Sequence, residues 1–304
     1  MNKDFISIAD YSREEIEHIF DVTKDLKDKT KAGTEHHVCE GKSMSMIFAK
    51  PSARTRISFE TGMYQLGGYA LYLSPNDIGI GKREAVKDIA QVVSRYNDVI
   101  MARLFEHAHM VEMAKFASVP VINGLTDYNH PCQIMADIYT VKEHKGRHTD
   151  LKITYIGDGN NIANSWINLA AKLPLHLVIC SPGGYEPDPD TLEYARNEGI
   201  STVEVLTDPV AAVKDADVIY TDVWASMGQE EEAAERRKIF MPYQVNSQLM
   251  QHAHKDALVM HCLPAHRGDE ITDEVIDGPQ SIVFDEAENR MHVQKAIISV
   301  LLNK

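Results

Sequence analysis

The 304 residues exceed what one hydrophobic core usually holds, and apolar and charged fractions of 44% and 25% are ordinary for a globular protein. A formal net charge of −14 without any basic run argues against a nucleic-acid partner, because nothing is present to neutralise a row of phosphates. No segment approaches the roughly 18 consecutive apolar residues of a membrane span, and the first residues lack the apolar core of a signal peptide. We therefore expect a two-domain, cytoplasmic protein that binds no membrane.

The cysteines give no sign of a disulfide framework or a zinc ribbon. They are far apart in the sequence and form no C-x-x-C pair: Cys39, Cys132, Cys180 and Cys262. Free thiols in a reducing compartment are the expectation for such a pattern.

The N-terminal part of the chain predicts a helix, a strand and a second helix. Ser12-Arg-Glu-Glu15 is a capping box before a helix, and Ser43–Phe48 is a short buried strand. Ser52 then stands where a helix N-cap belongs, and an apolar stripe at three- and four-residue spacing follows it. Arg54 and Arg56 occupy the first turn, although its free N–H groups and dipole already make it electropositive. This concentration of positive charge predicts a site for a small anion.

The rest of the chain alternates strands with helices, which predicts parallel α/β sheets. In the first half, a short apolar run is found at 69–73, strands are expected at 98–102 and 119–124, a helix at 86–96, another helix after residue 133 to about 144, and a loop at 74–84. In the second half, strands are expected at 151–156, 176–180, 216–220 and 257–260, with helices from about 163 and over 290–302. The polar segment 145–150 is typical of a hinge, so the two predicted domains divide between residues 147 and 148.

In parallel sheets, ligands bind outside the carboxyl ends of the strands. The unusual polar residues of this chain fall there: Ser52–Arg56, Arg103, His130, Gln133, Asn160, Asn161, Asp222–Gly228 and His261–Arg267. We therefore expect an α/β protein of two domains, each a parallel sheet flanked by helices, with the active-site cleft between them.

The common cofactor and metal motifs are incomplete. Gly157 and Gly159 open a turn, but a dinucleotide fingerprint needs a third glycine where Ile162 stands, and no P-loop is present. Zinc at 130–133 or 261–264 is a weaker alternative, since neighbouring residues of a strand point to opposite faces. A Cys–His hydrolase needs a side-chain contact that the sequence does not establish. No cofactor and no metal are expected.

Four motifs occur in order: Ser52-Ala-Arg-Thr-Arg56, His130-Pro-Cys-Gln133, Asp222-Val-Trp-Ala-Ser-Met-Gly228 and His261-Cys-Leu-Pro264. This set resembles the aspartate/ornithine transcarbamoylase family, and Ser226-Met-Gly228 with Cys262 is similar to its ornithine-using branch. The likeness extends over nearly the whole chain. It implies two α/β domains, 1–147 joined by a last helix at 290–304, and 148–289. It also implies transfer of a carbamoyl group from carbamoyl phosphate to the δ-amine of ornithine, giving citrulline and phosphate, as a step of arginine metabolism.

The resemblance assigns roles to single residues. The residues expected to bind carbamoyl phosphate are Ser52, Ala53, Arg54, Thr55, Arg103, His130, Gln133, Cys262, Leu263 and Arg290. The catalytic residues expected are Arg103, His130 and Cys262, and those expected to bind ornithine are Asn161, Asp222, Ser226 and Met227. Arg103 would bridge the phosphate and the carbonyl oxygen, to which His130 would donate, because charge develops at both places in the transition state. Cys262 would be a strand-end thiolate beside cations, able to receive the proton of the amine.

The same resemblance implies three larger features. The segment 227–238 would close over ornithine, Leu263–Pro264 would be a cis peptide, and the chain would form a homotrimer or a multiple of trimers.

Two positions depart from the family pattern. Ala53 replaces a threonine of the usual first motif, and Gly79 stands where relatives carry a glutamine that reaches a neighbouring subunit's site. Loss of that side chain would weaken carbamoyl phosphate binding by one hydrogen bond, ~1 kcal/mol, unless Lys82 or Arg83 substitutes for it. Two alternatives stay open: a transcarbamoylase with another amine acceptor (putrescine, aspartate or acetylornithine), and a phosphate- or amino-acid-binding protein without turnover.

Overall fold

The computed structural model describes residues 2–80, 83–225 and 230–303, which form two compact units. Unit 1 is Met1–Ala136 with Glu288–Lys304, and unit 2 is Asp137–Ala287. Both divisions fall inside helices, α6 (Pro131–Lys145) and α13 (Val283–Leu302). The domain boundary expected between residues 147 and 148 stays a prediction. None of the described helices has the length and apolar character needed to cross a membrane.

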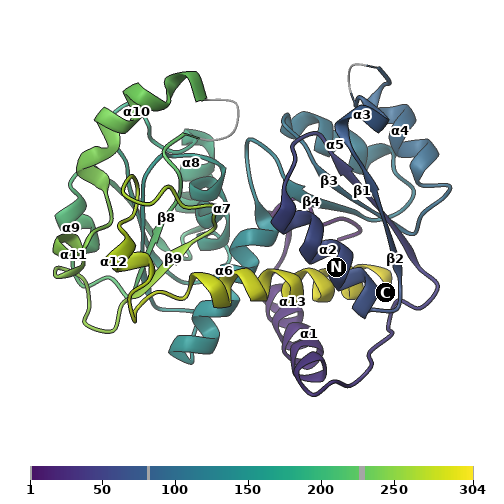
Figure 1. Ribbon diagram of the computed structural model, residues 1–304, viewed down its shortest axis with the longest axis horizontal. Helices are drawn as coiled ribbons and strands as arrows, with labels where there is room; N and C mark the ends of the chain where they lie inside the picture. The colour runs from purple at the N-terminus through teal and green to yellow at the C-terminus, as the bar shows by residue number, and fades with distance from the viewer. Residues whose placement is uncertain (1, 81–82, 226–229, 304) are drawn as a thin grey trace. The chain divides into compact units, whose positions relative to one another are not determined.

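Unit 1 is built on a four-stranded parallel sheet in the order β2-β1-β3-β4 (Figure 1). Its strands are β1 (Ser43–Phe48), β2 (Tyr69–Leu73), β3 (Val99–Arg103) and β4 (Val121–Leu125). Its helices besides parts of α6 and α13 are η1 (Ile8–Asp10), α1 (Arg13–Lys31), α2 (Ala53–Gln65), α3 (Pro75–Ile78), α4 (Val86–Val93) and α5 (His107–Phe116). Phe5 extends the sheet beyond β4, because its N–H donates to Val121 and its carbonyl accepts from Asn123. β2 forms the opposite edge.

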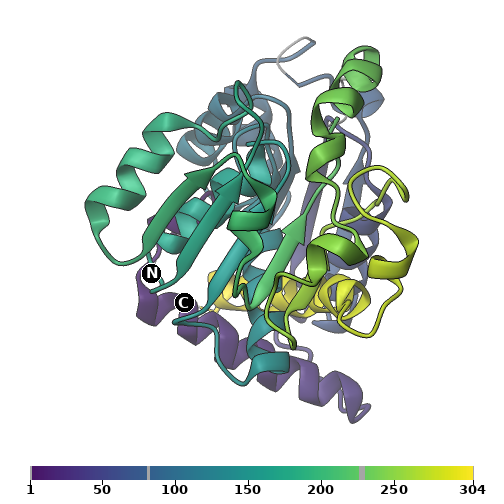
Figure 2. The same ribbon diagram turned by 90° about the vertical axis from the view of Figure 1, so that its left-hand side faces the viewer.

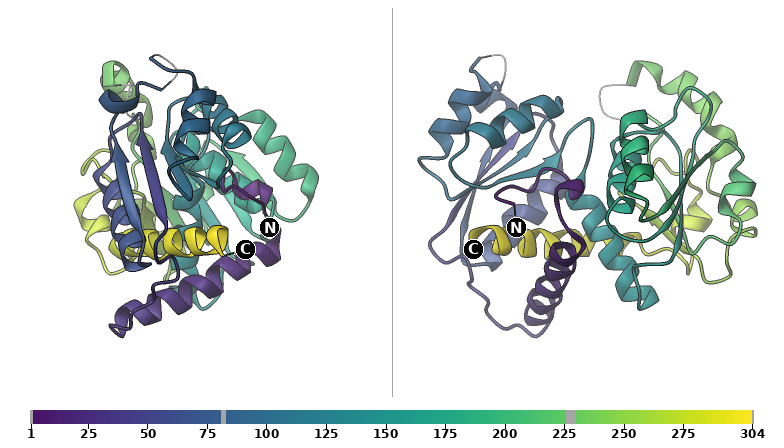
Figure 3. Two further views of the ribbon diagram at one scale, coloured as in Figure 1. Left: turned by 90° about the vertical axis from the view of Figure 1, so that its right-hand side faces the viewer. Right: turned by 180° about the vertical axis from the view of Figure 1, so that it is seen from behind.

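The two faces of this sheet are covered by different helices. On one face, Ile89 of α4 and Met110 of α5 pack with Ile47 and Ile100 of the strands, all of them buried. On the other face lie α2 and the part of α13 that belongs to unit 1 (Figures 1 and 3). Gly62 permits close packing there, since a Cβ at this position would stand 3.1 Å from Lys295 Cγ. Burial on both faces explains why β3 and β4 are nearly continuous apolar runs, whereas the edge strand β2 is partly exposed.

Unit 2 is built on a five-stranded parallel sheet in the order β7-β6-β5-β8-β9 (Figure 2). Its strands are β5 (Lys152–Ile156), β6 (His176–Cys180), β7 (Thr202–Leu206), β8 (Val218–Thr221) and β9 (Leu258–His261). Its helices are α7 (Asn161–Ala170), α8 (Pro189–Glu198), α9 (Pro209–Val213), η2 (Glu230–Glu232), α10 (Ala233–Phe240), η3 (Met241–Tyr243), α11 (Ser247–Met250) and α12 (Asp273–Ile276). α7 and α8 lie over one face of the sheet, and α9 and α11 over the other (Figure 1).

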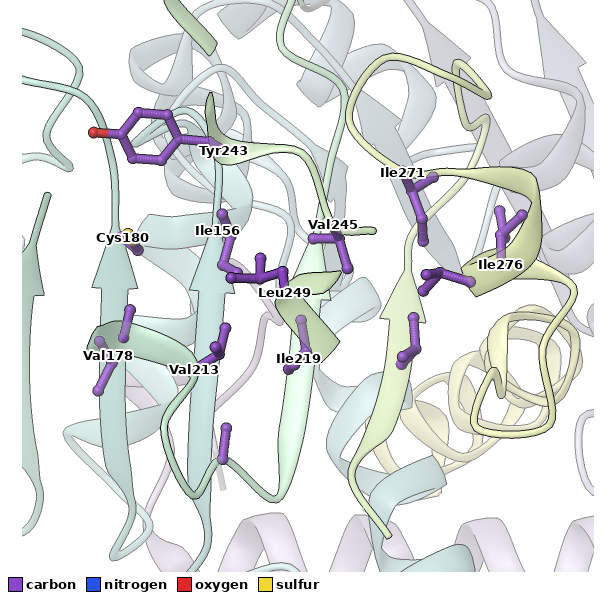
Figure 4. Packing of buried hydrophobic residues seen from close by; sticks show 14 of the residues in the cluster. Ile156, Val178, Cys180, Val213, Ile219, Tyr243, Val245, Leu249, Ile271 and Ile276 are labelled. Atoms are coloured by element: carbon purple, nitrogen blue, oxygen red, sulfur yellow. The ribbon is translucent and has the colours of Figure 1, made fainter. Parts of the chain in front are cut away.

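The core of unit 2 on the α9 and α11 side is formed by branched aliphatic side chains (Figure 4). Ile156 and Ile219 of the strands pack with Val213, Val245 and Leu249 from the covering segments. This packing fixes the direction of β5 and β8, whose carboxyl ends carry the polar residues of the candidate site.

The structure confirms two parallel sheets flanked by helices, and it changes several details. The last helix begins at Val283 rather than Arg290, because the acidic run 285–288 suits the electropositive first turn of a helix. The expected loop 74–84 contains the short helix α3. β7 had not been expected, although Thr202-Val-Glu-Val-Leu206 alternates as an edge strand does. All four cysteines are free, as predicted.

Candidate active site

The first turn of α2 provides the first group of polar atoms, in unit 1. Ser52 is the N-cap predicted from the sequence: its hydroxyl accepts from the N–H of Thr55 at 3.3 Å. The turn contains no acidic residue. Arg54 Nε is buried and has no hydrogen-bond partner within the described part of the chain. Free N–H groups, a helix dipole and an unused guanidinium nitrogen together suit a bound anion.

The second guanidinium of this turn is engaged elsewhere. Arg56 Nε donates to Glu60 Oε2 at 3.1 Å, and the guanidinium carbon lies 4.1 Å from the centre of the Tyr72 ring. Both contacts lie on the exposed side of α2. Of the two arginines that suggested an anion site, only Arg54 is therefore available to it.

Four further cationic or polar residues of unit 1 are buried near the same turn. Arg103, the last residue of β3, and Arg290 of α13 are 6% and 4% exposed, and Arg290 Nη2 donates to Thr55 Oγ1 at 3.0 Å. His130, which precedes α6, has its pKa held well below the usual 6.5, first by burial and then by the charges of Arg290 and Arg103. Gln133, in the first turn of α6, is also buried. A cluster of buried cations around a neutral imidazole favours an anionic ligand.

The loop that carries His130 is held by amide side chains that sequence analysis did not identify. Asn123 Nδ2 donates to Asn129 Oδ1 at 2.6 Å, and Asn129 Nδ2 donates to the carbonyl of Ile6 at 3.2 Å. Thr126 Oγ1 also donates to Asn129 Oδ1, at 3.2 Å. Asn129 directly precedes His130, but it contacts residues that are distant in the sequence, such as Ile6, and no local sequence pattern predicts these contacts.

The structure explains one departure from the family pattern. Gly79 is the C-cap of α3 with φ of 55°, a conformation that disfavours a glutamine, and a Cβ there would lie 2.9 Å from Arg83 Cβ. Arg83 Nη2 donates to the carbonyl of Asp77, so this side chain is already engaged. Lys82, the other proposed substitute, lies outside the described residues.

Asp222 is the centre of the second group of polar atoms, in unit 2. It follows β8 and is 7% exposed. Asn160, the N-cap of α7, donates from Nδ2 to Asp222 Oδ2 at 2.9 Å, and the N–H of Val223 donates to Oδ1 at 2.8 Å. The thiol of Cys262 donates to Oδ1 at 3.0 Å. A buried carboxylate fixed in this way suits an ammonium group.

The surroundings of Cys262 correct its expected ionisation. Burial, and then the charge and hydrogen bond of Asp222, raise the pKa of this thiol well above its usual value, and Glu286 and Asp137 add to the effect. The expected strand-end thiolate is therefore wrong, because the neighbouring charges that act on Cys262 are negative. The side chain is a neutral hydrogen-bond donor.

The turn after Cys262 is held by buried polar contacts. Leu263 has φ of 56°, which a branched side chain rarely adopts, and its N–H donates to His261 Nδ1 at 2.9 Å. His261 therefore carries its proton on Nε2, which lies 3.0 Å from Glu270 Oε1, and both side chains are fully buried. The cis peptide expected at Leu263–Pro264 is confirmed. Sequence analysis missed Glu270, since it lies after the motif and meets His261 only in the fold.

A buried acid also holds the carboxyl end of β9. Glu286 accepts from the N–H of His261 at 3.1 Å and from the hydroxyl of Tyr220 at 3.3 Å. Burial, and then the charge and hydrogen bond of Asp137, raise the pKa of Glu286 well above its usual value.

The candidate cofactor and metal positions have other uses. A Cβ at Gly159 would lie 2.3 Å from the carbonyl carbon of Glu186, so this glycine permits a close approach of backbone rather than marking a dinucleotide site. Within the described residues, Asp222, His261 and Cys262 bring possible ligand atoms within 4.8 Å of one another. Their atoms are already engaged in the hydrogen bonds given above, which an ion would have to break.

The structure thus brings the expected residues together in two groups. Unit 1 gathers Thr55, Arg103, His130 and Arg290, and unit 2 gathers Asp222 and Cys262, with Asn161 in the first turn of α7. Ser226 and Met227 lie outside the described residues, as does the beginning of the expected closing segment 227–238.

Comparison with known proteins gives a family match for both parts of the chain. The family model described as the carbamoyl-P binding domain of aspartate/ornithine carbamoyltransferase matches residues 3–143, and that of the Asp/Orn binding domain matches 149–301. A protein from Pisum sativum named chloroplastic ornithine carbamoyltransferase is 58% identical over 99% of this chain and 81% of its own. An ornithine carbamoyltransferase from Thermococcus kodakarensis is 55% identical over 99% of this chain and 96% of its own.

Solved structures give the same result. The ornithine carbamoyltransferase from Pyrococcus furiosus has a TM-score of 0.95 at 52% identity, over 99% of this chain and 97% of that chain. The enzyme of that name from Thermus thermophilus has a TM-score of 0.90 at 38% identity, over 99% of each chain.

Proposed function

The chain belongs to the aspartate/ornithine carbamoyltransferase family, and we propose that it transfers the carbamoyl group of carbamoyl phosphate to the δ-amine of L-ornithine, giving L-citrulline and phosphate. The observation that carries the proposal is the convergence of Arg103 and Arg290 on a neutral His130 in unit 1. The reaction builds negative charge on a carbonyl oxygen and on the leaving phosphate, and fixed cationic donors stabilise both.

In this reaction unit 1 binds carbamoyl phosphate. The phosphate lies against the first turn of α2, where Ser52, Ala53 and Thr55 offer backbone N–H groups and Arg54 a guanidinium. Arg103 bridges the phosphate and the carbonyl oxygen, as a planar fork of donors can. The remaining contacts with carbamoyl phosphate are those of His130, Gln133, Arg290, Cys262 and Leu263.

The low pKa of His130 fits its role. A neutral imidazole donates one N–H to the carbonyl oxygen without bringing a third positive charge into a buried cluster. The oxygen keeps this donor throughout the neutral pH range.

Unit 2 binds ornithine. The carboxylate of Asp222 takes the α-ammonium, and Asn161, with Ser226 and Met227 of the segment outside the described residues, completes the contacts. Cys262 holds Asp222 in position as a donor and lies near the attacking amine.

Assembly and compartment complete the proposal. We propose a homotrimer, or a multiple of trimers, as the family precedent suggests. The edge strand β2 and the outer face of α2 supply an apolar surface for a second copy: Ile57, Tyr64, Tyr69 and Leu71 are 62%, 77%, 65% and 41% exposed. We place the protein in the cytoplasm, where four free cysteines stay reduced.

The test is citrulline formation from carbamoyl phosphate, with ornithine, putrescine, aspartate and acetylornithine compared as acceptors under the same conditions. Turnover with ornithine alone supports the proposal. Turnover with another amine would leave unit 1 as assigned and change the acceptor, and folded protein without any turnover would favour a binding role.

A further inference from the structure

Lys295 is a lysine buried inside unit 1, on α13 one turn after Arg290. Its side chain is 0% exposed. The ammonium donates to Thr30 Oγ1 at 2.6 Å and to Gln65 Oε1 at 2.8 Å, and it lies 3.2 Å from His36 Nε2. These three acceptors match the three protons of a charged lysine.

The acceptors are fixed in that role by their other contacts. The hydroxyl of Thr30 donates its own proton to the carbonyl of Leu26 at 2.7 Å. His36 Nδ1 lies 2.9 Å from the carbonyl of Thr34, so Nδ1 carries the ring proton and Nε2 accepts from Lys295. The cluster is therefore complete only when Lys295 is charged and His36 is neutral.

This cluster attaches the C-terminal end of α2 to α13, whereas the candidate phosphate site is at the N-terminal end of α2. α13 contacts α2 near its start through Arg290 and Thr55, at 3.0 Å, and at its end through Lys295 and Gln65, at 2.8 Å. Between these points the helices pack closely at Gly62. α1 lies on the other side of this part of α13 and is attached to it by Thr30 (Figure 3). Two separated attachments determine the direction in which the first turn of α2 points.

We propose that Lys295 is a positioning residue, which through Gln65 holds the phosphate-binding turn of α2 in place and makes phosphate affinity depend on pH. The inference rests on the proposed function of that turn and adds to it a residue that touches no substrate.

The pH dependence follows from burial. Burial lowers the pKa of Lys295 from the usual 10.5 to about 8. The acceptors Thr30, His36 and Gln65 line a groove of about 580 Å³, through which solvent reaches the cluster. Above pH 8 the lysine loses a proton and with it part of the attachment, so phosphate should bind more weakly.

The other charged groups around Lys295 do not account for this change. On α1, Lys27 donates to Asn289 at 2.7 Å and Lys31 pairs with Glu288 at 3.4 Å. On α13, burial and the charge of Lys295 lower the pKa of His292 to about 4, so this ring is neutral. On α2 the partner is the uncharged Gln65, and on the segment before β1 it is His36. Lys295 is thus the member of this cluster expected to titrate near pH 8.

The expected pH dependence of phosphate affinity is distinct from the pH dependence of the free energy of unfolding. Because the pKa of Lys295 in the folded protein lies below that of an unfolded lysine, unfolding takes up a proton between pH 8 and 10.5. The contribution of this group to the free energy of unfolding therefore rises with pH in the range where the attachment is lost. A merely structural role predicts no parallel loss of phosphate affinity.

The experiment is calorimetric titration of the full-length protein with inorganic phosphate between pH 7 and 9.5, without ornithine. In the wild type the Kd should rise as the pH passes through about 8. Lys295→Met should weaken binding roughly tenfold at pH 7 and abolish that rise. Gln65→Glu should move the rise to higher pH, because a carboxylate beside the ammonium stabilises its charged form.

Lys27→Met is the matched control, since it removes a buried lysine of α1 that donates to Asn289 of α13, and it should leave the pH dependence in place. A wild-type pH dependence that both Lys295→Met and Gln65→Glu leave unchanged overturns the role of Lys295. If Lys295→Met does not fold, Gln65→Glu decides: a Kd for phosphate that rises at the same pH as in the wild type overturns the role of Lys295. A wild-type protein that binds no phosphate overturns the proposed phosphate site instead.

Discussion

The thiol of Cys262 and the amide of Asn160 donate to opposite oxygens of one carboxylate, that of Asp222, at 3.0 and 2.9 Å. Asp222 is thereby held by donors from two different strand ends. A carboxylate oriented in this way binds an ammonium group without first having to order its own side chain. The two donors explain why the candidate ornithine site depends on more residues than those that touch ornithine.

Replacing Asp222 with asparagine should raise the KM for ornithine by about 10- to 100-fold, because the charged partner of the α-ammonium is lost. The KM for carbamoyl phosphate should change little, since most of its expected contacts are in unit 1. Steady-state kinetics with each substrate varied in turn will check this, with the exposed Asp190→Asn of α8 as control. Equal losses for both substrates would contradict the division into two groups.

Cys262 should tolerate serine better than alanine. Serine keeps a donor for Asp222, whereas alanine removes one of the two donors to Oδ1 of this buried carboxylate, which costs about 1–3 kcal/mol. We expect Cys262→Ala to raise the KM for ornithine at least several-fold more than Cys262→Ser does.

The pH dependence of the same variant tests the ionisation of the thiol. Because its raised pKa keeps Cys262 protonated in the neutral range, Cys262→Ser should leave the pH–rate profile between pH 6 and 8 unchanged. A displaced limb in that range would show that the thiol titrates with the reaction.

Arg103→Ala should lower kcat by about 10²- to 10³-fold, because a buried cationic donor to the transition state is removed. Arg103→Lys should recover part of the rate, since it restores the charge but not the planar fork. Single-turnover kinetics will separate chemistry from binding, and Arg147→Ala, at an exposed arginine of unit 2, is the control. A loss of less than tenfold would remove Arg103 from the mechanism.

His130 should make stability depend on pH below neutrality. Its pKa in the folded protein is well below 6.5, whereas an unfolded histidine titrates near 6.5, so unfolding takes up a proton as the pH falls. The contribution of His130 to the free energy of unfolding therefore decreases below pH 6.5. Urea unfolding between pH 5 and 7 should show a smaller decrease in His130→Gln than in the wild type. Parallel curves for the two proteins would argue against a neutral, buried imidazole.

Sequence patterns correctly predicted the features that depend on residues close together in the chain. Ser52 was identified as an N-cap because its bond to Thr55 is made within one turn, and the parallel sheets were predicted because strands alternate with helices along the chain. The family likeness supplied the cis peptide at Leu263–Pro264. The outward direction of Arg56 was not predictable, because it depends on Tyr72 of a neighbouring strand.

The residues that sequence analysis missed act over long separations. Glu270, Glu286 and Asn129 stand outside the recognised positions, and each is tied to the site by contacts that only the folded chain creates. The ionisation of Cys262 was wrong for the same reason: its pKa is raised by burial and by acids from three separate segments. A sequence shows which groups can titrate, but their neighbours decide at what pH they do.

The composition of unit 1 has a consequence for synthesis. The ribosome makes the segment Met1–Ala136 before all of unit 2, and only after unit 2 the segment from Glu288 that contains Arg290 and Lys295. Until that segment emerges, Thr55, Gln65 and His36 lack the partners they have in the finished protein. Unit 2 is one continuous stretch of the chain. Unit 1, in contrast, consists of a segment made before unit 2 and a segment made after it. A chain truncated before residue 288 would therefore contain all of unit 2 but would lack the part of α13 that completes unit 1.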